Sequence, residues 1–447
     1  MSMAQAALHR PVSKRRDTGI AFLVFLAVAV GGFSSARAAT YYWDTTGTTA
    51  GFGTASGTWN TSNYWSTSSA GTATTAGTSI TTSDSVFFGT DSLGLASGTV
   101  TITATGQSFG SMTFGSASGA ITLTSGSLTL ATSATVTMNA TVGTIGSVLT
   151  GASSGLVKEG TGTLTLVATN NYAGSTTINA GVLQIGSGTT TGAIASTGAI
   201  SIASGAGLVS NRSNTMTLSN NITGSGTITN GGTGELSLSG SNTFNGTIVA
   251  NAKMNITGTY AAIGVPNVVT NSTFSLGLPF VDGTCTINAL SGTGVVDATN
   301  GSTAGTRTIS IQTGTFAGAV ADSTSSRVMA VTKDGSGTLA LTGASTYTGP
   351  TTINAGVLQL GAGSTTGSIS GSSAITIASG ATLASNRSNS PTISNNITGS
   401  GTIANNGTGE LSLSGSNTFN GTIIANAKTN ITGTYAAIGV PNVVTNS

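Results

Sequence analysis

The sequence is poor in the residues that most often carry chemistry. It has one histidine, one cysteine and six prolines among 447 residues, and charged residues make up 5% of it. The histidine, His9, lies in the N-terminal segment, so the rest of the chain lacks the commonest general base and metal ligand. The single cysteine, Cys285, excludes an internal disulfide and a cysteine zinc site. We expect it to be buried and apolar in character, with a reactive or intermolecular thiol as the alternative.

The first 38 residues are typical of a secretory signal peptide. Basic residues between Arg10 and Arg16 precede a short apolar run, Ile20–Val30, and a small-x-small motif ends at Ala38. We therefore predict cleavage between Ala38 and Ala39. The apolar run is shorter than the about 20 residues of a transmembrane helix, and no later stretch is long and apolar enough to cross a bilayer.

Removal of this segment reverses the charge balance. The signal holds five basic residues and one acid, which leaves 13 − 5 = 8 basic and 11 − 1 = 10 acidic residues. A chain with so few lysines and arginines cannot neutralise the phosphates along a nucleic acid. We therefore exclude nucleic acid as a partner.

Short strands dominate the expected secondary structure. Glycine contributes 66 residues, about twice the usual share of ~7%. Polar and apolar residues alternate between glycine-containing turns, as in 99–103 and 127–130. This period of two is typical of half-buried strands, and no apolar stripe with helical spacing is present.

The sequence also repeats itself. Residues 158–272 align without a gap onto residues 333–447, at an offset of 333 − 158 = 175. A shorter offset of 232 − 160 = 72 places the same motif near 160, 232, 335 and 407. A fixed period predicts stacked units with a shared core rather than one domain with a single cleft. One coil of about 20 residues is indicated by inward aliphatic residues at Leu339, Leu358, Ile377 and Ile397.

These observations predict an all-β fold: a right-handed parallel β-helix, or β-solenoid, with an aromatic-rich N-terminal cap. Trp43, Trp59 and Trp65 are expected to plug the first coil, with an exposed platform that stacks on sugars as the alternative. We divide the chain into a signal peptide (1–38), an N-terminal β-rich capping region (39–145), a first β-solenoid repeat unit (146–272), an inter-repeat β-solenoid segment (273–331) and a second repeat unit (332–447). We expect the second unit to be truncated, because the first copy continues past Ser272, the counterpart of Ser447.

The best-defined copy of the motif spans residues 333–361. It reads Lys-x-Gly-x-Gly-Thr-Leu-x-Leu-x-Gly and then Tyr-x-Gly-x-Thr-x-Ile-x-x-Gly-x-Leu, and residues 158–186 match it closely. This pattern resembles the autotransporter-associated β-strand repeat, also called the passenger-associated transport repeat. The copies near 232 and 407 are divergent, with Phe244 and Phe419 at the tyrosine position. We assign structural roles to the motif positions Gly160, Leu164, Leu166, Tyr172, Gly174, Ile178, Gly181, Leu183, Gly335, Leu339, Leu341, Tyr347, Gly349, Ile353, Gly356 and Leu358.

The resemblance implies an exported, non-catalytic β-helical passenger or surface stalk, with adhesion as a further role. The partners that it implies are an outer-membrane translocator, in a missing C-terminal part or a separate protein, and a glycan or cell-surface ligand. The implied location is outside the inner membrane, secreted or on the surface of a Gram-negative-type bacterium. The family motif carries no catalytic residue, and we expect neither a cofactor nor a metal.

The alternative is a β-helical polysaccharide-active enzyme or a carbohydrate-binding surface protein. Such an enzyme needs clustered carboxylates, whereas the acids here are scattered, and Glu159 and Glu235 are several coils apart. We therefore expect no enzymatic activity.

The remaining polar residues of the repeats receive structural interpretations. Lys158 and Lys333 are interpreted as solvated charges at turns. Arg212 and Arg387 are interpreted as surface-loop residues, with contact to a glycan or an acidic partner as the alternative. Stacked amide ladders are predicted at the turns that contain Asn220-Asn221 and Asn395-Asn396.

Overall fold

The computed structural model describes residues 38–61, 63–73, 79–103, 106–195, 197–258, 265–277, 281–298, 303–434 and 441–446. Contacts within the chain divide it into Met1–Arg37 and Ala38–Ser447. The predicted signal peptide before Ala38 lies outside the described residues. In the described part all regular secondary structure is β-strand, which confirms the all-β prediction. That part also contains no helix with the length and hydropathy that a membrane span requires.

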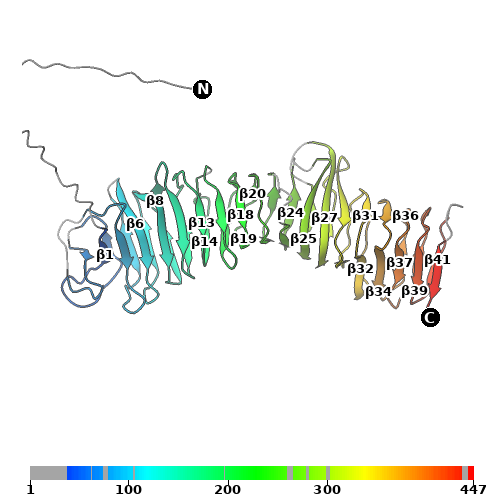
Figure 1. Cartoon of the computed structure of the whole chain (residues 1–447), viewed down its shortest axis with the longest axis horizontal. Helices are drawn as coiled ribbons and strands as arrows, with labels where there is room; N and C mark the ends of the chain where they lie inside the picture. The colour runs from blue at the N-terminus through cyan, green and yellow to red at the C-terminus, as the bar shows by residue number, and fades with distance from the viewer. Residues whose placement is uncertain are drawn as a thin grey trace, which may run out of the picture. The chain divides into compact units, whose positions relative to one another are not determined.

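From Ala38 onward the strands form a parallel solenoid whose coils each pass over three faces (Figure 1). The first face contains β1 (Thr40–Trp43), β4 (Ser85–Phe88), β6 (Gln107–Phe114), β8 (Ser127–Met138), β11 (Gly155–Glu159), β13 (Thr176–Ile178), β15 (Ile200–Ile202), β18 (Ile222–Gly224), β29 (Arg327–Lys333), β31 (Thr351–Ile353), β33 (Ile375–Ile377) and β36 (Ile397–Gly399). The short strand β3 (Trp65–Ser66) pairs antiparallel with β1.

The second face is the longest continuous one. It contains β2 (Gly57–Thr58), β5 (Gly98–Thr101), β7 (Ile121–Thr124), β9 (Val142–Ile145), β12 (Thr163–Leu166), β14 (Val182–Thr189), β16 (Gly207–Arg212), β19 (Thr227–Asn230), β21 (Thr247–Ala250), β23 (Asn267–Thr270), β25 (Gly283–Gly292), β27 (Gly305–Phe316), β30 (Thr338–Leu341), β32 (Val357–Ser364), β34 (Thr382–Arg387), β37 (Thr402–Asn405), β39 (Thr422–Ala425) and β41 (Asn442–Thr445). The strands β25 and β27 also extend onto the first face, because β27 pairs with both β29 and β30.

The third face has the shortest strands. It contains β10 (Val148–Thr150), β17 (Met216–Leu218), β20 (Leu236–Leu238), β22 (Met254–Ile256), β24 (Thr273–Leu276), β26 (Val295–Asp297), β28 (Ala319–Val320), β35 (Thr392–Ile393), β38 (Leu411–Leu413) and β40 (Thr429–Ile431). Within two runs, from β17 to β28 and from β35 to β40, consecutive members of this face pair in parallel, whereas β10 pairs with β8.

The pairing register explains the long repeat. On the second face Leu164 pairs with Leu183, and Leu183 pairs with Leu208, so successive coils differ in length. Eight such steps lead from Leu164 to Leu339. The numbers of these two leucines differ by the offset of the long repeat, so that repeat corresponds to eight coils.

The predicted series of inward aliphatic residues is wrong after its first step. Leu339 does pair with Leu358, but Leu358 pairs next with Leu383 on the same face. Ile377 pairs with Ile353 on the first face instead. The exposed stretch 362–366 lengthens this coil, so the even spacing in the sequence joined positions from two faces.

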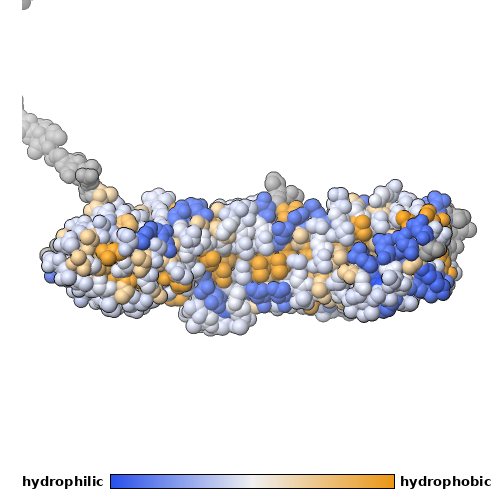
Figure 2. Space-filling view, turned by 90° about the horizontal axis from the view of Figure 1, so that it is seen from below, coloured by the Kyte–Doolittle hydropathy of each residue, from blue (hydrophilic) through white to orange (hydrophobic). Residues whose placement is uncertain are grey.

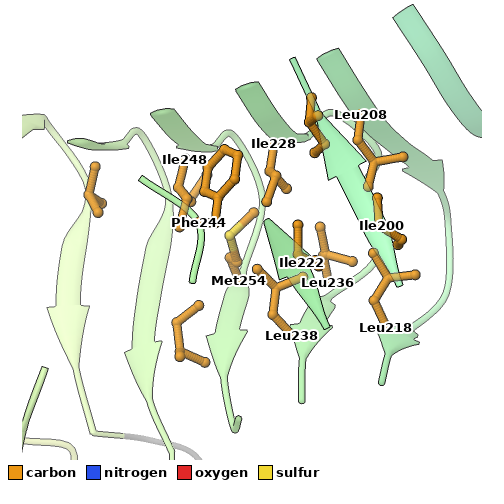
Figure 3. Close-up of a cluster of buried hydrophobic side chains, with 14 of the residues drawn as sticks. Ile200, Leu208, Leu218, Ile222, Ile228, Leu236, Leu238, Phe244, Ile248 and Met254 are labelled. Carbon is orange, nitrogen blue, oxygen red and sulfur yellow. The ribbon is translucent and has the colours of Figure 1, made fainter. Parts of the chain in front are cut away.

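Aliphatic side chains from all three faces meet in one continuous core. Figure 3 shows Ile200, Leu208 and Leu218, which come from the three faces of one coil and point toward one another. The next coil repeats this arrangement with Ile222, Ile228 and Leu236. Each such side chain contributes ~1.5–3 kcal/mol when it is fully buried, so each coil is stabilised mainly by its neighbours.

The aromatic residues near the N-terminus close the first coil. Trp43, Trp59 and Trp65 are at most 2% exposed, and their rings make edge contacts with centroids 5.2 and 4.8 Å apart. Phe88 continues the cluster and stacks on Phe114 of the next coil at 5.2 Å. The expected plug is therefore confirmed, and the alternative of an exposed sugar-stacking platform is wrong for these tryptophans.

The predicted asparagine ladders lie at a different turn. Asn220 and Asn395 are buried, and the Asn220 amide donates to the carbonyl oxygens of Ala195 and Gly198 rather than to another asparagine. Asparagine amides do stack elsewhere: Asn271 donates to Asn251 at 2.9 Å. In the second unit Asn446, Asn426 and Asn406 form a longer ladder.

Candidate functional site

The two strong copies of the motif are built around a buried lysine. Lys158 and Lys333 are both fully buried, at the end of a first-face strand. The Lys333 ammonium donates to the carbonyl oxygens of Asp334, Gly335 and Ala355 at 2.6, 2.7 and 3.1 Å. Lys158 makes the same three bonds one unit earlier. The interpretation of these lysines as solvated charges is wrong, because all three N–H donors hold turn carbonyls of two successive coils.

Burial makes these ammonium groups more acidic than usual. Desolvation lowers the pKa of Lys158 from 10.5 to about 8, and the nearby Glu159 carboxylate opposes this change. Desolvation likewise lowers the pKa of Lys333, against the effect of Asp334. Between the folded and unfolded pKa values the unfolded chain binds more protons at Lys158, so this group makes the free energy of unfolding fall as pH decreases there and rise as pH increases.

We expect Lys158 to add about 1 kcal/mol to the free energy of unfolding between pH 7 and pH 9. The comparison stops at pH 9 because burial raises the pKa of Cys285, and higher pH then favours the unfolded thiolate. Urea unfolding of the wild type and of Lys158→Met at both pH values measures the difference. The pH-dependent gain should be smaller in Lys158→Met by about this amount, because Lys333 keeps its own contribution; an equal gain in both proteins contradicts the assignment.

The motif glycines stand where the backbones of neighbouring coils meet. Gly160, Gly181, Gly335 and Gly356 have φ of 74°, 61°, 70° and 64°, which favours glycine. A Cβ on Gly356 would clash with the carbonyl oxygens of Gly337 and Gly335 in the preceding turn. Gly174 and Gly349 have no positive φ, but a Cβ there would clash with the carbonyls of Ser154 and Met329.

The motif tyrosines are buried with a satisfied hydroxyl group. Tyr172 and Tyr347 are at most 1% exposed, and each hydroxyl shares a 2.7 Å hydrogen bond with Thr176 or Thr351 four residues later. Burial raises the pKa of Tyr172 to about 12, despite the hydrogen bond to Thr176. These hydroxyls therefore remain protonated and serve packing.

The aliphatic motif positions all lie in the core. Leu164 stacks on Leu183, and Leu339 stacks on Leu358. The fully or almost fully buried positions are Leu164, Leu166, Ile178, Leu183, Leu339, Leu341, Ile353 and Leu358.

In the divergent copies of the motif, the leucine pair lies one face further along the coil. Leu236 and Leu238 lie on β20 of the third face, whereas Leu164 and Leu166 lie on β12 of the second face. Phe244 is fully buried in place of the tyrosine. The same strand–turn–strand pattern therefore occurs at two different positions around the coil.

Arg212 and Arg387 fasten an exposed loop of the preceding coil. The Arg212 guanidinium donates to the carbonyl oxygens of Thr190 and Gly192 at 2.7 and 2.8 Å, and also to the Asn214 side chain. Arg387 repeats the arrangement with Thr365, Gly367 and Asn389. Both arginines end a second-face strand, so their interpretation as loop residues is wrong.

A groove of about 460 Å³ lies beside Arg387, which forms part of its lining. Its lining mixes small residues such as Ala317 and Ala344 with hydroxyl side chains such as Thr342, Thr366 and Ser368. None of the described residues that line it is a carboxylate, so the groove lacks the acid pair that glycoside hydrolysis requires.

The acids of the repeats pair locally instead of converging. Glu235 forms an ion pair with Lys253 at 3.0 Å, whereas Glu159 accepts a hydrogen bond from Asn179 at 2.6 Å. Glu159 is the last residue of β11 on the first face, whereas Glu235 directly precedes β20 on the third face, so the structure does not bring them together. Among the described residues no group of three His, Cys, Asp or Glu side chains is placed to hold a metal ion.

Cys285 faces the core on β25. It is 3% exposed, and burial raises the pKa of its thiol to about 12. The thiolate is the reactive form of cysteine, and burial opposes its formation, which agrees with the expected buried, apolar role.

Comparison with known families agrees with this geometry. The family model of the passenger-associated-transport-repeat matches residues 156–185, 231–252, 331–360 and 406–427. These are the four places at which the motif recurs, and each contains strands that stack on neighbouring coils. Neither the curated proteins nor the solved structures contain a match to this chain.

Proposed function

We propose that this chain, whose four passenger-associated transport repeats are coils of one solenoid, is the exported, non-catalytic passenger or surface stalk of an autotransporter-like protein. The observation that carries the proposal is that the motif residues all serve coil stacking: buried aliphatic residues, glycines at close contacts and a lysine that holds turn carbonyls. A motif devoted to stacking suits a rod better than an active site.

Stacking also supplies a mechanism for export. A coil that emerges on the outer side buries its apolar side chains on the previous coil, and this gain opposes return of the chain. In-register contacts such as Leu339 on Leu358 let each coil form as soon as its predecessor is in place. The translocator that this requires, and the location outside the cell, belong to the same proposal.

The predicted signal cleavage fits the start of the solenoid. The backbone N–H of Ala39 donates to the buried Asp84 carboxylate at 2.8 Å. Cleavage between Ala38 and Ala39 would turn that nitrogen into an ammonium group, and the hydrogen bond would become an ion pair. Adhesion through a glycan or cell-surface ligand stays a further proposal for the exposed hydroxyl and amide rows of the rod.

The test is the surface yield of a core variant. In cells that export the full-length protein, Leu339→Asp together with Leu358→Asp should lower the fraction accessible to external protease at least about tenfold, because both carboxylates would be buried without partners. The matched control is Thr338→Asp with Thr352→Asp, whose side chains point outward from strands of the same coil. Unchanged export of the leucine variant would refute the stacking mechanism.

A further inference from the structure

The sequence of the N-terminal capping region contains no basic side chain. No lysine, arginine or histidine occurs between Ala39 and Val157, whereas Asp44, Asp84 and Asp91 lie in this stretch. Figure 2 shows this end of the rod at the left, where white and orange residues predominate and the strongly hydrophilic residues drawn in blue are scarce on the side in view. A buried acid in this region therefore has no side-chain cation of the same region with which to pair.

Asp84 is such a buried acid, at the turn that precedes β4. Its Oδ2 atom accepts hydrogen bonds from the backbone N–H and the hydroxyl group of Thr81, both at 2.8 Å. Its Oδ1 atom accepts the backbone N–H of Ala39 at 2.8 Å. Burial opposes ionisation of Asp84, but the hydrogen bonds from Ala39 and Thr81 outweigh it and lower the pKa of the carboxyl group. No lysine or arginine in the part of the chain that the structure describes forms an ion pair with this carboxylate.

The Ala39 contact also positions the first strand of the solenoid. The Ala39 carbonyl oxygen accepts the backbone N–H of Ser85 at 2.8 Å, so both polar groups of the Ala39 backbone are held. From there β1 runs in register with β4, and Trp43 at its end is fully buried in the aromatic cluster. The Asp84 carbonyl oxygen accepts the N–H of Gly110 in the next coil at 2.8 Å. This one contact therefore connects the start of β1 to two following coils.

Signal cleavage would place a cation at this contact. Ala38 is exposed, whereas the nitrogen of Ala39 lies 2.8 Å from the Asp84 carboxylate. Cleavage between Ala38 and Ala39 converts that amide nitrogen into an α-ammonium group. Its ordinary pKa is about 7.7–8.0, so it is mostly charged at neutral pH. Charge on both partners strengthens a hydrogen bond, and a partly buried site with a low local dielectric strengthens it further.

We propose that removal of the signal peptide stabilises the first coil, because the Ala39 α-ammonium group becomes the cation of the buried Asp84 carboxylate and holds β1 on β4. This inference rests on the export and signal cleavage of the proposed function. The precursor has only a neutral N–H at this site, so its first coil opens more readily than that of the mature chain. The aromatic plug of the core therefore reaches its full stability only after the chain has been exported and cleaved.

The ion pair is tested on the mature chain, residues 39–447, with a free or an acetylated N-terminus. The acetyl group keeps the Ala39 N–H but removes its charge. Hydrogen exchange of the amides in β1 and β4 should be at least about tenfold faster in the acetylated chain, because the first coil then opens more often. Amides in β33 and β34 should exchange equally in both chains, because a coil of a solenoid contacts only its neighbours.

Two further chains separate the charge from the shape of the site. Asp84→Asn keeps the shape of the side chain and removes its charge, so acetylation should then change the exchange of β1 by less than about twofold. A chain that begins at Ala38 leaves Asp84 untouched and moves the ammonium group by about 3.8 Å. It should exchange faster in β1 than the chain that begins at Ala39. Equal exchange of the free and acetylated chains overturns the proposal, and so does an undiminished effect of acetylation in Asp84→Asn.

The N-terminus of the exported protein separates this proposal from the stacking mechanism. Mass spectrometry of the exported chain should identify Ala39 as its first residue. A different first residue overturns the proposed ion pair but leaves export by coil stacking intact. Unchanged export of Leu339→Asp with Leu358→Asp refutes the stacking mechanism, whereas the exchange rates of the purified mature chain still decide on the ion pair.

Discussion

Gly356→Ala is expected to lower the free energy of unfolding of its coil by about 3 kcal/mol or more. Gly356 has a φ of 64°, and a Cβ would clash with the carbonyl oxygens of Gly337 and Gly335. Both clashing atoms belong to the backbone, and the Gly335 oxygen also accepts a hydrogen bond from Lys333, so no side-chain rotation can relieve the clash. The substitution therefore combines backbone strain with loss of the close approach between two coils.

A second glycine separates these two effects. Gly380 has a φ of 81° but nothing within 4 Å of the position of its Cβ. Gly380→Ala should cost about 1 kcal/mol, from the left-handed conformation alone. Hydrogen exchange measures the local stability of each affected coil, from the amides of β31 and β32 for Gly356 and from those of β33 and β34 for Gly380. Equal destabilisation by the two substitutions would show that the close approach at Gly356 does not matter.

Much of the architecture is predictable from the sequence because its signals are periodic. Alternation such as Thr338-Leu339-Ala340-Leu341 predicts a half-buried strand, and the structure places both leucines in the core. The long repeat predicts stacking, and the tryptophans predict a closed N-terminal end. Each of these signals depends on hydrophobic burial, which a sequence pattern records directly.

The polar interior is not predictable in the same way. A lysine beside an acid at a glycine-rich turn is usually solvated, and nothing in Lys333-Asp334-Gly335 reveals that three carbonyl oxygens converge on the ammonium group. One of those oxygens belongs to Ala355, which reaches it only through the winding of the next coil. Such a site depends on tertiary geometry, although its recurrence at Lys158 is a signal that favours a structural role.

The face of the coil on which each strand lies is not predictable from the sequence either. The nearly even spacing of the aliphatic residues that follow Leu339 suggested one uniform coil, whereas Leu358 and Leu383 are separated by a longer coil. Loop insertions change coil length without disturbing the core, so a linear spacing cannot show which face a strand occupies.

The most direct test of the account compares two deletions in the exported full-length protein. Removal of residues 158–332 takes out eight coils and sets Lys333 in the place of Lys158, so the remaining coils should stack in register. Removal of residues 158–331 takes out nearly the same sequence but sets Thr332 in the place of Lys158, which shifts the register by one position within a strand. The readout is the fraction of chain accessible to external protease on intact cells.

We expect the in-register deletion to reach the surface within about twofold of the wild type, on a rod shortened by about 38 Å, or eight coils at ~4.8 Å each. The shifted deletion should fall at least about tenfold, because inward aliphatic residues would face solvent at the junction. Equal surface yields for the two deletions would contradict the claim that in-register stacking of the coils carries export.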